Sequence, residues 1–237
     1  MSIRPSKRNL DEIRDISIKT NINNYAEGSC LISFGNTQVI CTASVEEKVP
    51  HFLRNKGQGW ITANYNMLAR STHQRIDKDP LKPNGRNLEI QRLISRSLRF
   101  AVDLKLLGER QITIDCDVIQ ADGSTRCASI TGGFVALSLA IKKLLRDRTI
   151  DYNPMKNEVC AVSCGIYNNQ IMADLDYLED SKCEVDCNFV LNKNYDLIEI
   201  QGTAEAGSMT FKQVSEMYEL AKKSAEKIIQ IQRSALQ

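Results

Sequence analysis

The chain has 237 residues, of which 42% are hydrophobic and 25% charged, a composition typical of globular proteins rather than of disordered, collagen-like or coiled-coil chains. Its apolar runs are far shorter than the ~20 residues that cross a bilayer, and its basic N-terminus lacks the apolar stretch of an export signal, so we expect a cytoplasmic protein without a membrane partner. The formal net charge of +2 does not by itself indicate a polyanion partner.

The charges are unevenly distributed along the chain. Residues 70–110 contain ten basic and five acidic residues, a net of +5, whereas residues 170–210 contain nine acidic and two basic residues, a net of −7. This asymmetry suits a protein that holds phosphates with one segment and a cation with another. Two solvated faces that neutralise each other explain it equally well.

The first third of the chain is predicted to be mostly β-structure. Residues 30–34 and 38–44 are apolar-rich strands, and Gly35 and Asn36 between them suit a tight hairpin turn. Residues 57–70 show a less regular pattern. Residues 77–85, which include two prolines and a glycine, predict a loop.

An amphipathic helix is predicted after this loop, because apolar residues recur at three- and four-residue spacing over residues 90–102, and we expect Gly108 to end it. Its polar side carries four arginines, Arg86, Arg92, Arg96 and Arg99. A solvated face partly neutralised by Glu89 and Asp103 explains Arg96 and Arg99 at least as well as a binding role does.

The segment after the next strand carries the first candidate site. Residues 111–120 alternate as a strand does, residues 130–145 form a largely buried helix, and the sequence ADGSTR lies between them. Backbone N–H groups at a helix start, the hydroxyls of Ser124 and Thr125 and the guanidinium of Arg126 together suit an oxyanion such as phosphate. Arg86 could reach the same phosphate. Ser124 or Thr125 acting only as a helix cap is an equal alternative.

The remaining chain predicts two hairpins and a final helix. Strands at 158–166 and 170–175 flank Asn168 and Asn169, and strands at 185–191 and 197–201 follow. Thr210 with Gln213 forms a capping-box pattern at the start of the last helix. These elements predict an α+β fold of mixed β-sheets packed with helices, in a single domain over residues 1–237.

The second candidate site is an acidic hairpin. Residues 173–188 hold six carboxylates, at Asp174, Asp176, Glu179, Asp180, Glu184 and Asp186. Oxygen ligands without a nearby histidine suit Mg²⁺ or Mn²⁺ that also meets a substrate phosphate. Asp180 and Asp186 flank the turn and could hold one ion, or either could protonate a leaving oxygen. A solvated acidic turn is the more frequent outcome for such a composition.

Other chemistry is less well supported. The eight cysteines include two pairs, Cys160 with Cys164 and Cys183 with Cys187, but their spacing and the lack of a nearby histidine make buried core thiols a better explanation than zinc ligands. With only two histidines, no Ser-His-Asp or Cys-His arrangement is indicated.

Several long motifs occur in the order found in the ribonuclease PH family. They are AEGS at Ala26, GQGW at Gly57, GRNLEIQRLISRSLR from Gly85, LGERQITIDCDVIQADGSTR from Leu107, DLDYLEDSKCEVDCN from Asp174 and EIQGTAE from Glu199. From residue 4 to about residue 232, the chain therefore resembles these phosphate-dependent 3′ exoribonucleases, which are related to polynucleotide phosphorylase and to exosome ring subunits.

The resemblance implies a ribosomal-protein-S5-domain-2-like ribonuclease PH fold and a homohexamer built as a trimer of dimers. It implies attack of inorganic phosphate, the co-substrate, on the last linkage of tRNA precursors and other RNAs, with release of nucleoside diphosphates in a reversible nucleotidyl transfer. No DNA partner is expected.

The resemblance also assigns roles to single residues. Arg86, Ser124, Thr125 and Arg126 resemble the phosphate site, Asp180 and Asp186 the metal and acid positions, and Arg70, Arg75 and Arg92 positions that guide RNA or support subunit contacts. Two residues depart from the family pattern: Ser124 replaces a usual glycine, and Asn64 stands where an acidic residue is common. A non-catalytic RNA-binding ring subunit of an exosome-like assembly is the main alternative, and a small-molecule phosphotransferase is a third.

Overall fold

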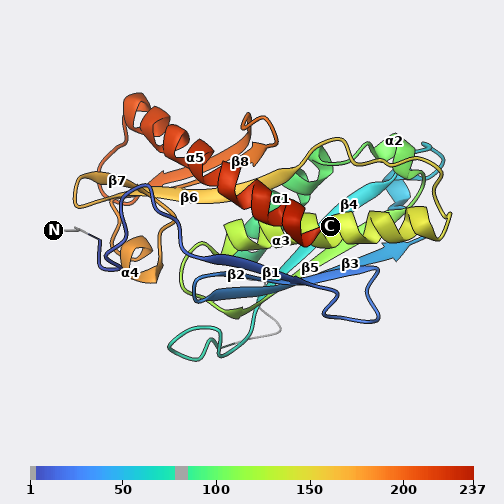
Figure 1. Ribbon diagram of the computed structural model, residues 1–237, viewed down its shortest axis with the longest axis horizontal. Helices are drawn as coiled ribbons and strands as arrows, with labels where there is room; N and C mark the ends of the chain where they lie inside the picture. The colour runs from blue at the N-terminus through green and yellow to red at the C-terminus, as the bar shows by residue number, and fades with distance from the viewer. Residues whose placement is uncertain (1–3, 78–84) are drawn as a thin grey trace.

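The computed structural model describes residues 4–77 and 85–237. Within them the chain folds into two β-sheets packed with helices (Figure 1), which confirms the predicted α+β class. The predicted loop at 77–85 lies, apart from its two end residues, outside the described residues.

The larger sheet has five strands in the order β1-β2-β3-β5-β4. They are β1 (Ile16–Thr20), β2 (Gly28–Phe34), β3 (Thr37–Glu46), β4 (Trp60–Met67) and β5 (Gln111–Gln120). β2 and β3 form the predicted hairpin, and only β4 runs parallel to its neighbour, β5, within the described sheet. The less regular segment that we expected at 57–70 is therefore a strand. Its pattern is weak because the small Ala63 takes a buried position while Asn64 and Asn66, which have low β-propensity, take exposed ones.

The smaller sheet is antiparallel, with four strands in the order β7-β6-β8-β9. They are β6 (Val159–Tyr167), β7 (Gln170–Ala173), β8 (Val185–Asn192) and β9 (Leu197–Ala204). Both predicted hairpins are present, and Asn168 and Asn169 turn the first with φ of 51° and 57°, a conformation that asparagine tolerates. Cys160 and Cys164 on β6 are fully buried, as expected of core thiols.

The helices are α1 (Gly85–Phe100), α2 (Leu104–Leu107), α3 (Thr125–Arg146), α4 (Tyr177–Asp180) and α5 (Phe211–Ala235), with a 3-10 turn at His51–Leu53. α1 ends at Phe100 instead of continuing to Gly108, because the Asp103 carboxylate accepts from two backbone N–H groups and starts the separate helix α2. Gly108 ends α2. The capping box predicted for Thr210 and Gln213 is present at the start of α5.

α3 lies between the two sheets and packs against β2 and β3 on one side and β6 on the other (Figure 1). The helix approaches β2 so closely that a Cβ on Gly28 would lie 2.1 Å from the carbonyl oxygen of Ala136. Among the described residues, α3 alone is long and apolar enough to cross a membrane, yet 78% of its most apolar window is buried inside the protein. The tight packing identifies α3 as a core helix. The same packing fixes the direction of its first turn.

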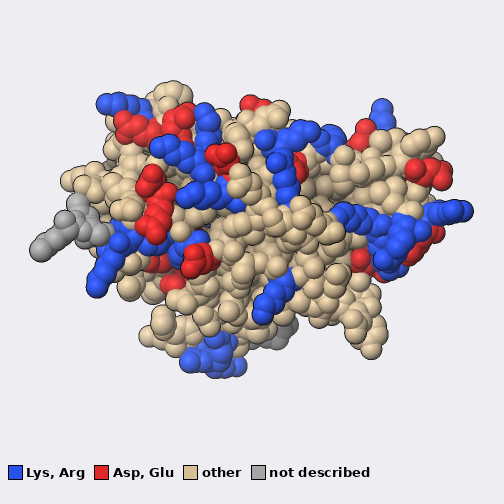
Figure 2. Space-filling model, in the orientation of Figure 1, with Lys and Arg blue, Asp and Glu red and all other residues tan. Residues whose placement is uncertain are grey.

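Basic and acidic side chains lie close together on the face that carries α5 (Figure 2). The basic segment 70–110 and the acidic segment 170–210 also meet elsewhere, where α1 passes β9 and Arg96 pairs with Glu199. Part of the charge asymmetry in the sequence is therefore neutralised inside one molecule.

Candidate active site

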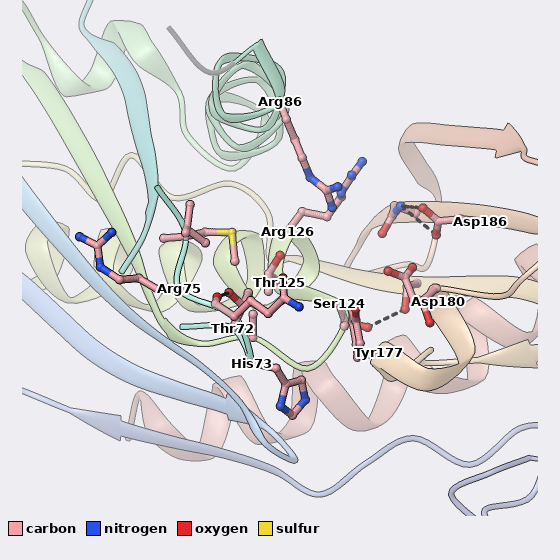
Figure 3. A pocket seen from close by; sticks show the side chains of 18 residues that line it. Thr72, His73, Arg75, Arg86, Ser124, Thr125, Arg126, Tyr177, Asp180 and Asp186 are labelled. Carbon is pink, nitrogen blue, oxygen red and sulfur yellow. Dashed lines mark hydrogen bonds between the residues drawn. The ribbon is translucent and has the colours of Figure 1, made fainter. Parts of the chain in front are cut away.

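A cavity of about 790 Å³ opens where the first turns of α1 and α3 face α4 and the start of β8 (Figure 3). Its lining includes Arg86, Ser124, Thr125, Arg126, Asp180 and Asp186. The structure thus brings together all six residues expected to bind phosphate, hold a metal or act as an acid, although they come from three segments up to 100 residues apart in the sequence.

Residues 121–126, which are the loop that precedes α3 and the first two residues of that helix, are called the phosphate loop below. Gly123 has φ of 75°, and a Cβ there would lie 2.5 Å from the carbonyl oxygen of Leu175, so only glycine fits. Ser124 is the residue before the helix and has φ of 55°. Because α3 begins at Thr125, the N–H groups of its first turn have no intrahelical acceptor and carry the positive end of the helix dipole. This end of the helix suits an anion.

The side chain of Ser124 has a different role from the two that the sequence suggested. It makes no capping hydrogen bond to α3. Its Oγ lies 2.7 Å from Ser163 Oγ, 3.1 Å from Asp174 Oδ1 and 3.0 Å from the carbonyl oxygen of Leu175. The hydroxyl that replaces the usual glycine is therefore engaged with the neighbouring hairpin, and the backbone N–H is what Ser124 can offer an anion.

Thr125 keeps its hydroxyl proton available. The buried Tyr65 hydroxyl donates to Thr125 Oγ1 at 2.9 Å, so Thr125 can donate its own proton into the cavity. Burial raises the pKa of Tyr65, which keeps this donor protonated.

Two side chains, those of Gln201 and Glu89, hold the guanidinium of Arg126 in place. Its Nη1 donates to Gln201 Oε1 at 3.0 Å and lies 3.8 Å from the Glu89 carboxylate, while Gln201 donates to Glu89. The side chain of Arg126 is 17% exposed. Arg86 extends from the start of α1 toward Arg126 (Figure 3), so two guanidiniums face the same part of the cavity.

Asp180 and Asp186 lie across the cavity from the arginines. A capping box between Asp176 and Glu179 forms α4, which ends at Asp180, and Asp186 follows the first residue of β8. Burial, together with the charge of Asp180, raises the pKa of Asp186 to about 6, and burial also raises the pKa of Asp180, although Arg86 and Arg126 oppose that shift. Asn188 donates weakly to Asp186 at 3.4 Å.

These two carboxylates suit a hard cation. Both offer oxygen donors, and each is destabilised in its charged form by burial, which a cation would offset. Within residues 4–77 and 85–237, no group of three or more His, Cys, Asp or Glu side chains is placed to hold an ion. The pair would therefore need water and substrate phosphate to complete the coordination of Mg²⁺, which commonly binds in this way.

The arginines expected to guide RNA are not gathered at one place. Arg75 lines the cavity, but its guanidinium points away from the two carboxylates (Figure 3). Arg70 donates to the carbonyl oxygen of His73 and shapes its own loop. Arg92 lies in a separate hollow along α1 with Arg96 and Arg99.

Some residues in or next to the cavity were given no site role by the sequence. His73 and Tyr177 line the cavity with ring centroids 5.9 Å apart, and Gln201 and Glu89 support Arg126. Gln201 lies in the EIQGTAE motif and Glu89 in the arginine-rich helix, so both had a sequence signal. That signal could not show that the two side chains meet.

The raised pKa of Asp186 predicts how stability depends on pH in the absence of divalent metal. Because the pKa is about 6 in the folded chain against 3.8 for an ordinary aspartate, the folded state binds more protons between these values, and stability is lost as pH rises through this window. Asp186→Asn, which cannot ionise, should therefore be more stable than wild type by about 1–3 kcal/mol at pH 8 in EDTA.

Thermal unfolding at pH 8 and pH 4 measures this effect. The advantage of Asp186→Asn should disappear at pH 4, where the wild-type carboxyl is protonated. An advantage of equal size at both pH values, or a less stable variant at pH 8, would contradict the raised pKa.

Comparison with known proteins agrees with the motifs. Residues 12–142 match domain 1 of the 3′ exoribonuclease family, and residues 157–224 match domain 2. Curated proteins named Ribonuclease PH from Caulobacter vibrioides (strain NA1000 / CB15N) and Methylobacterium radiotolerans are 52% and 50% identical over 236 residues. The alignments cover 99% of this chain and 99% and 100% of those proteins. Our expectation of one domain over residues 1–237 stays a prediction.

Solved structures share the fold at low sequence identity. Rice (Oryza sativa) Rrp46 matches with a TM-score of 0.80 at 19% identity, covering 99% of this chain and 100% of that one. A chain of the Archaeoglobus fulgidus exosome with RNA bound to the active site matches with a TM-score of 0.83 at 22% identity, covering 96% and 91%. The predicted fold is thereby confirmed.

Proposed function

Because the chain belongs to the ribonuclease PH family of 3′ exoribonucleases, we propose that the cavity between α3 and β8 is where it shortens RNA from the 3′ end by phosphorolysis. Inorganic phosphate is the co-substrate and RNA the polymer substrate. The relatives named Ribonuclease PH support the tRNA nucleotidyltransferase class for this chain, and the same reaction run in reverse extends a 3′ end.

Phosphate binds at the start of α3. The N–H groups of residues 124–126 and the hydroxyl of Thr125 donate to its oxygens, and the guanidiniums of Arg126 and Arg86 offset its charge. The support from Gln201 and Glu89 keeps the Arg126 guanidinium in place before phosphate arrives. Such preorganised charge is what two mutually repelling anions need in order to meet.

Asp180 and Asp186 would hold a divalent ion, Mg²⁺ or Mn²⁺, opposite this phosphate. When bound, the ion supplies positive charge next to the scissile linkage and the departing oxygen. The two carboxylates face the cavity from the side opposite Arg126, so a cation held there would place the linkage between two positively charged regions.

The reaction then exchanges one phosphorus–oxygen bond for another. An oxygen of inorganic phosphate bonds to the phosphorus of the last linkage, and the bond from that phosphorus to the 3′ oxygen of the preceding nucleotide breaks. The products are a nucleoside diphosphate and an RNA that is one nucleotide shorter. The departing 3′ oxygen takes a proton, which could come from whichever of Asp186 and Asp180 is protonated rather than bound to the ion, because burial raises the pKa of both carboxyls.

The physiological setting follows from the family resemblance. We propose tRNA precursors as substrates, a cytoplasmic location and a homohexamer built from three dimers. Large apolar side chains exposed on the single chain, among them Tyr25 at 95% and Phe211 at 86%, favour burial of further surface between subunits. Arg70, Arg75 and Arg92 remain candidates for RNA or subunit contacts.

One observation carries the proposal: Arg126 at the start of α3 and the pair Asp180 and Asp186 line the same cavity. A non-catalytic ring subunit would not need both charged groups in one place, so this observation disfavours that alternative. It also disfavours a small-molecule phosphotransferase, for which the chain shows no nucleotide-cradling motif.

The test is decay of a short 3′-extended RNA by the purified protein with Mg²⁺, in the presence and absence of inorganic phosphate. We expect decay to require phosphate and to release nucleoside diphosphates, identified by chromatography. Release of nucleoside monophosphates would indicate hydrolysis instead. Binding of RNA without any decay would support the non-catalytic ring subunit.

A further inference from the structure

The two halves of the cavity are joined by a buried arginine outside the predicted site. Arg14, which precedes β1, donates through Nη1 to the carbonyl oxygen of Asp122 in the phosphate loop. Its Nη2 donates to Asp174 Oδ1 at 2.7 Å and to the carbonyl oxygen of Leu175 at 3.3 Å. One guanidinium therefore spans the phosphate loop and the segment that leads to α4 and Asp180, which we call the carboxylate arm (residues 174–186).

Asp174 is the centre of this junction. It is 2% exposed and its Oδ2 accepts from the backbone N and from Nε of Arg14, at 2.8 and 2.9 Å. The hydrogen bonds and charges of Arg14, with the charge of Arg8, lower its pKa against the effect of burial, so it is ionised. Asp174 also contacts the phosphate loop directly, because its Oδ1 accepts a hydrogen bond from Ser124 Oγ. Asp174 thus holds the arm and the loop to the same guanidinium.

The backbone at the junction adopts uncommon conformations that need such support. Ser124 and Asp174 both lie in the left-handed region, with φ of 55° and 52°. Gly123 packs directly on the backbone of Leu175 and Asp176. Non-glycine residues hold this conformation at some cost and only when their surroundings fix them. The hydrogen bonds of Arg14, Asp174 and Ser124 are among the interactions that fix it here.

The consequence for the site is geometric. Arg126 lies two residues after Ser124, and Asp180 lies six residues after Asp174 at the end of a single capped turn. The distance between the phosphate-binding side and the metal-binding side therefore depends on where Ser124 meets Asp174, next to the hydrogen bond from Tyr177 N to Asp122 Oδ1 that also joins the loop to the arm. A displacement of about 1 Å between reacting groups can cost on the order of 100-fold in rate.

We propose that Arg14, Asp174 and Ser124 are positioning residues that lock the phosphate loop against the carboxylate arm, so that phosphate is bound at the correct distance from the linkage. The inference rests on the proposed function of the cavity. It gives the serine that replaces the usual glycine a role of its own, because its hydroxyl ties the loop to the arm.

The decisive variant is Arg14→Lys, which keeps the charge next to Asp174 but cannot reach three acceptors at once. We expect the KM for phosphate to rise about 10-fold and kcat to fall, while the Kd for RNA measured without phosphate stays within two-fold of wild type. A merely structural role would lower the fraction of active enzyme without moving the KM for phosphate.

Arg4→Lys is the matched control. Arg4 belongs to the same buried cluster and donates to Glu179 and to the carbonyl oxygen of Asp174, yet among the described residues none of its hydrogen bonds reaches the phosphate loop. It should lower the unfolding temperature but leave the KM for phosphate within two-fold of wild type. A KM that rises equally in both variants, or that does not rise in Arg14→Lys, would overturn the proposal.

Ser124→Ala keeps the proposal testable if Arg14→Lys does not fold, since it removes hydrogen bonds without leaving a buried charge unpaired. We expect a rise of about three- to ten-fold in the KM for phosphate. An unchanged KM would again overturn the proposed interlock, by which we mean the hydrogen bonds of Arg14, Asp174 and Ser124 that join the loop to the arm. Wild-type protein measured alongside separates failure of the proposed function from failure of the proposed positioning role. If wild type needs no phosphate, the proposed function fails; if it needs phosphate and both variants keep its KM, only the interlock fails.

Discussion

Replacing Arg126 by glutamine is expected to lower kcat/KM for phosphorolysis about 1,000-fold, which corresponds to about 4 kcal/mol of lost transition-state stabilisation. The side chain of Arg126 is 17% exposed and its guanidinium is already aligned by Gln201 and Glu89, so it contributes charge without reorganisation when phosphate binds. Glutamine fills similar space but cannot offset charge on phosphate. The loss should appear in the KM for phosphate as well as in kcat, because the proposed role of Arg126 is to contact the nucleophile before and during the reaction.

Two further variants sharpen this prediction. Arg126→Lys keeps the charge but loses two-pronged contact, and we expect an intermediate loss of about 100-fold. Arg146→Gln is the matched control, since Arg146 lies at the other end of the same helix with its side chain 74% exposed. Initial rates over a range of phosphate concentrations measure all three. An Arg126→Gln enzyme within ten-fold of wild type would remove Arg126 from the phosphate site.

Local patterns in the sequence were sufficient for most elements of the fold. The strand at 111–120, the turns at Gly35 and Asn168 and the capping box at Thr210 each depend on residues only a few positions apart, and all occur as predicted. β4 was missed because the small Ala63 at a buried position and the asparagines at positions 64 and 66 weaken the local strand pattern.

The candidate site was predictable in its members but not in its assembly. Helix-start and acidic-hairpin motifs identified both sides of the cavity separately, since each motif is local. The contacts that join them are not local: Ser124 meets Asp174 across 50 positions, and Arg14 meets Asp174 across 160. Nothing in the spacing of Ser124 showed that its hydroxyl would face away from the helix that it precedes. Sequence separation therefore explains why the interlock appears only in the structure.

Asp186→Asn should lower kcat about 1,000-fold at saturating phosphate and raise the Mg²⁺ concentration needed for half-maximal activity. Asparagine keeps an oxygen donor but loses the negative charge that favours a divalent ion and the proton that the departing 3′ oxygen would take. Because Asp180 shares the cavity and its charge contributes to the raised pKa of Asp186, Asp180→Asn should shift the Mg²⁺ dependence in the same direction.

Activity measured over a Mg²⁺ series, with Asp151→Asn as a control at an exposed aspartate, separates the two roles of the carboxylate. Activity that recovers at high Mg²⁺ would mean that Asp186 acts mainly as a ligand, whereas a low kcat at every Mg²⁺ concentration would place it in the chemical step. Full activity at ordinary Mg²⁺ would exclude both roles.

The Asp186→Asn substitution should also stabilise the metal-free protein at pH 8, as argued from the pKa of Asp186. A variant that is more stable and less active is the expected result if a buried carboxyl group is kept at this position for function at a cost in stability.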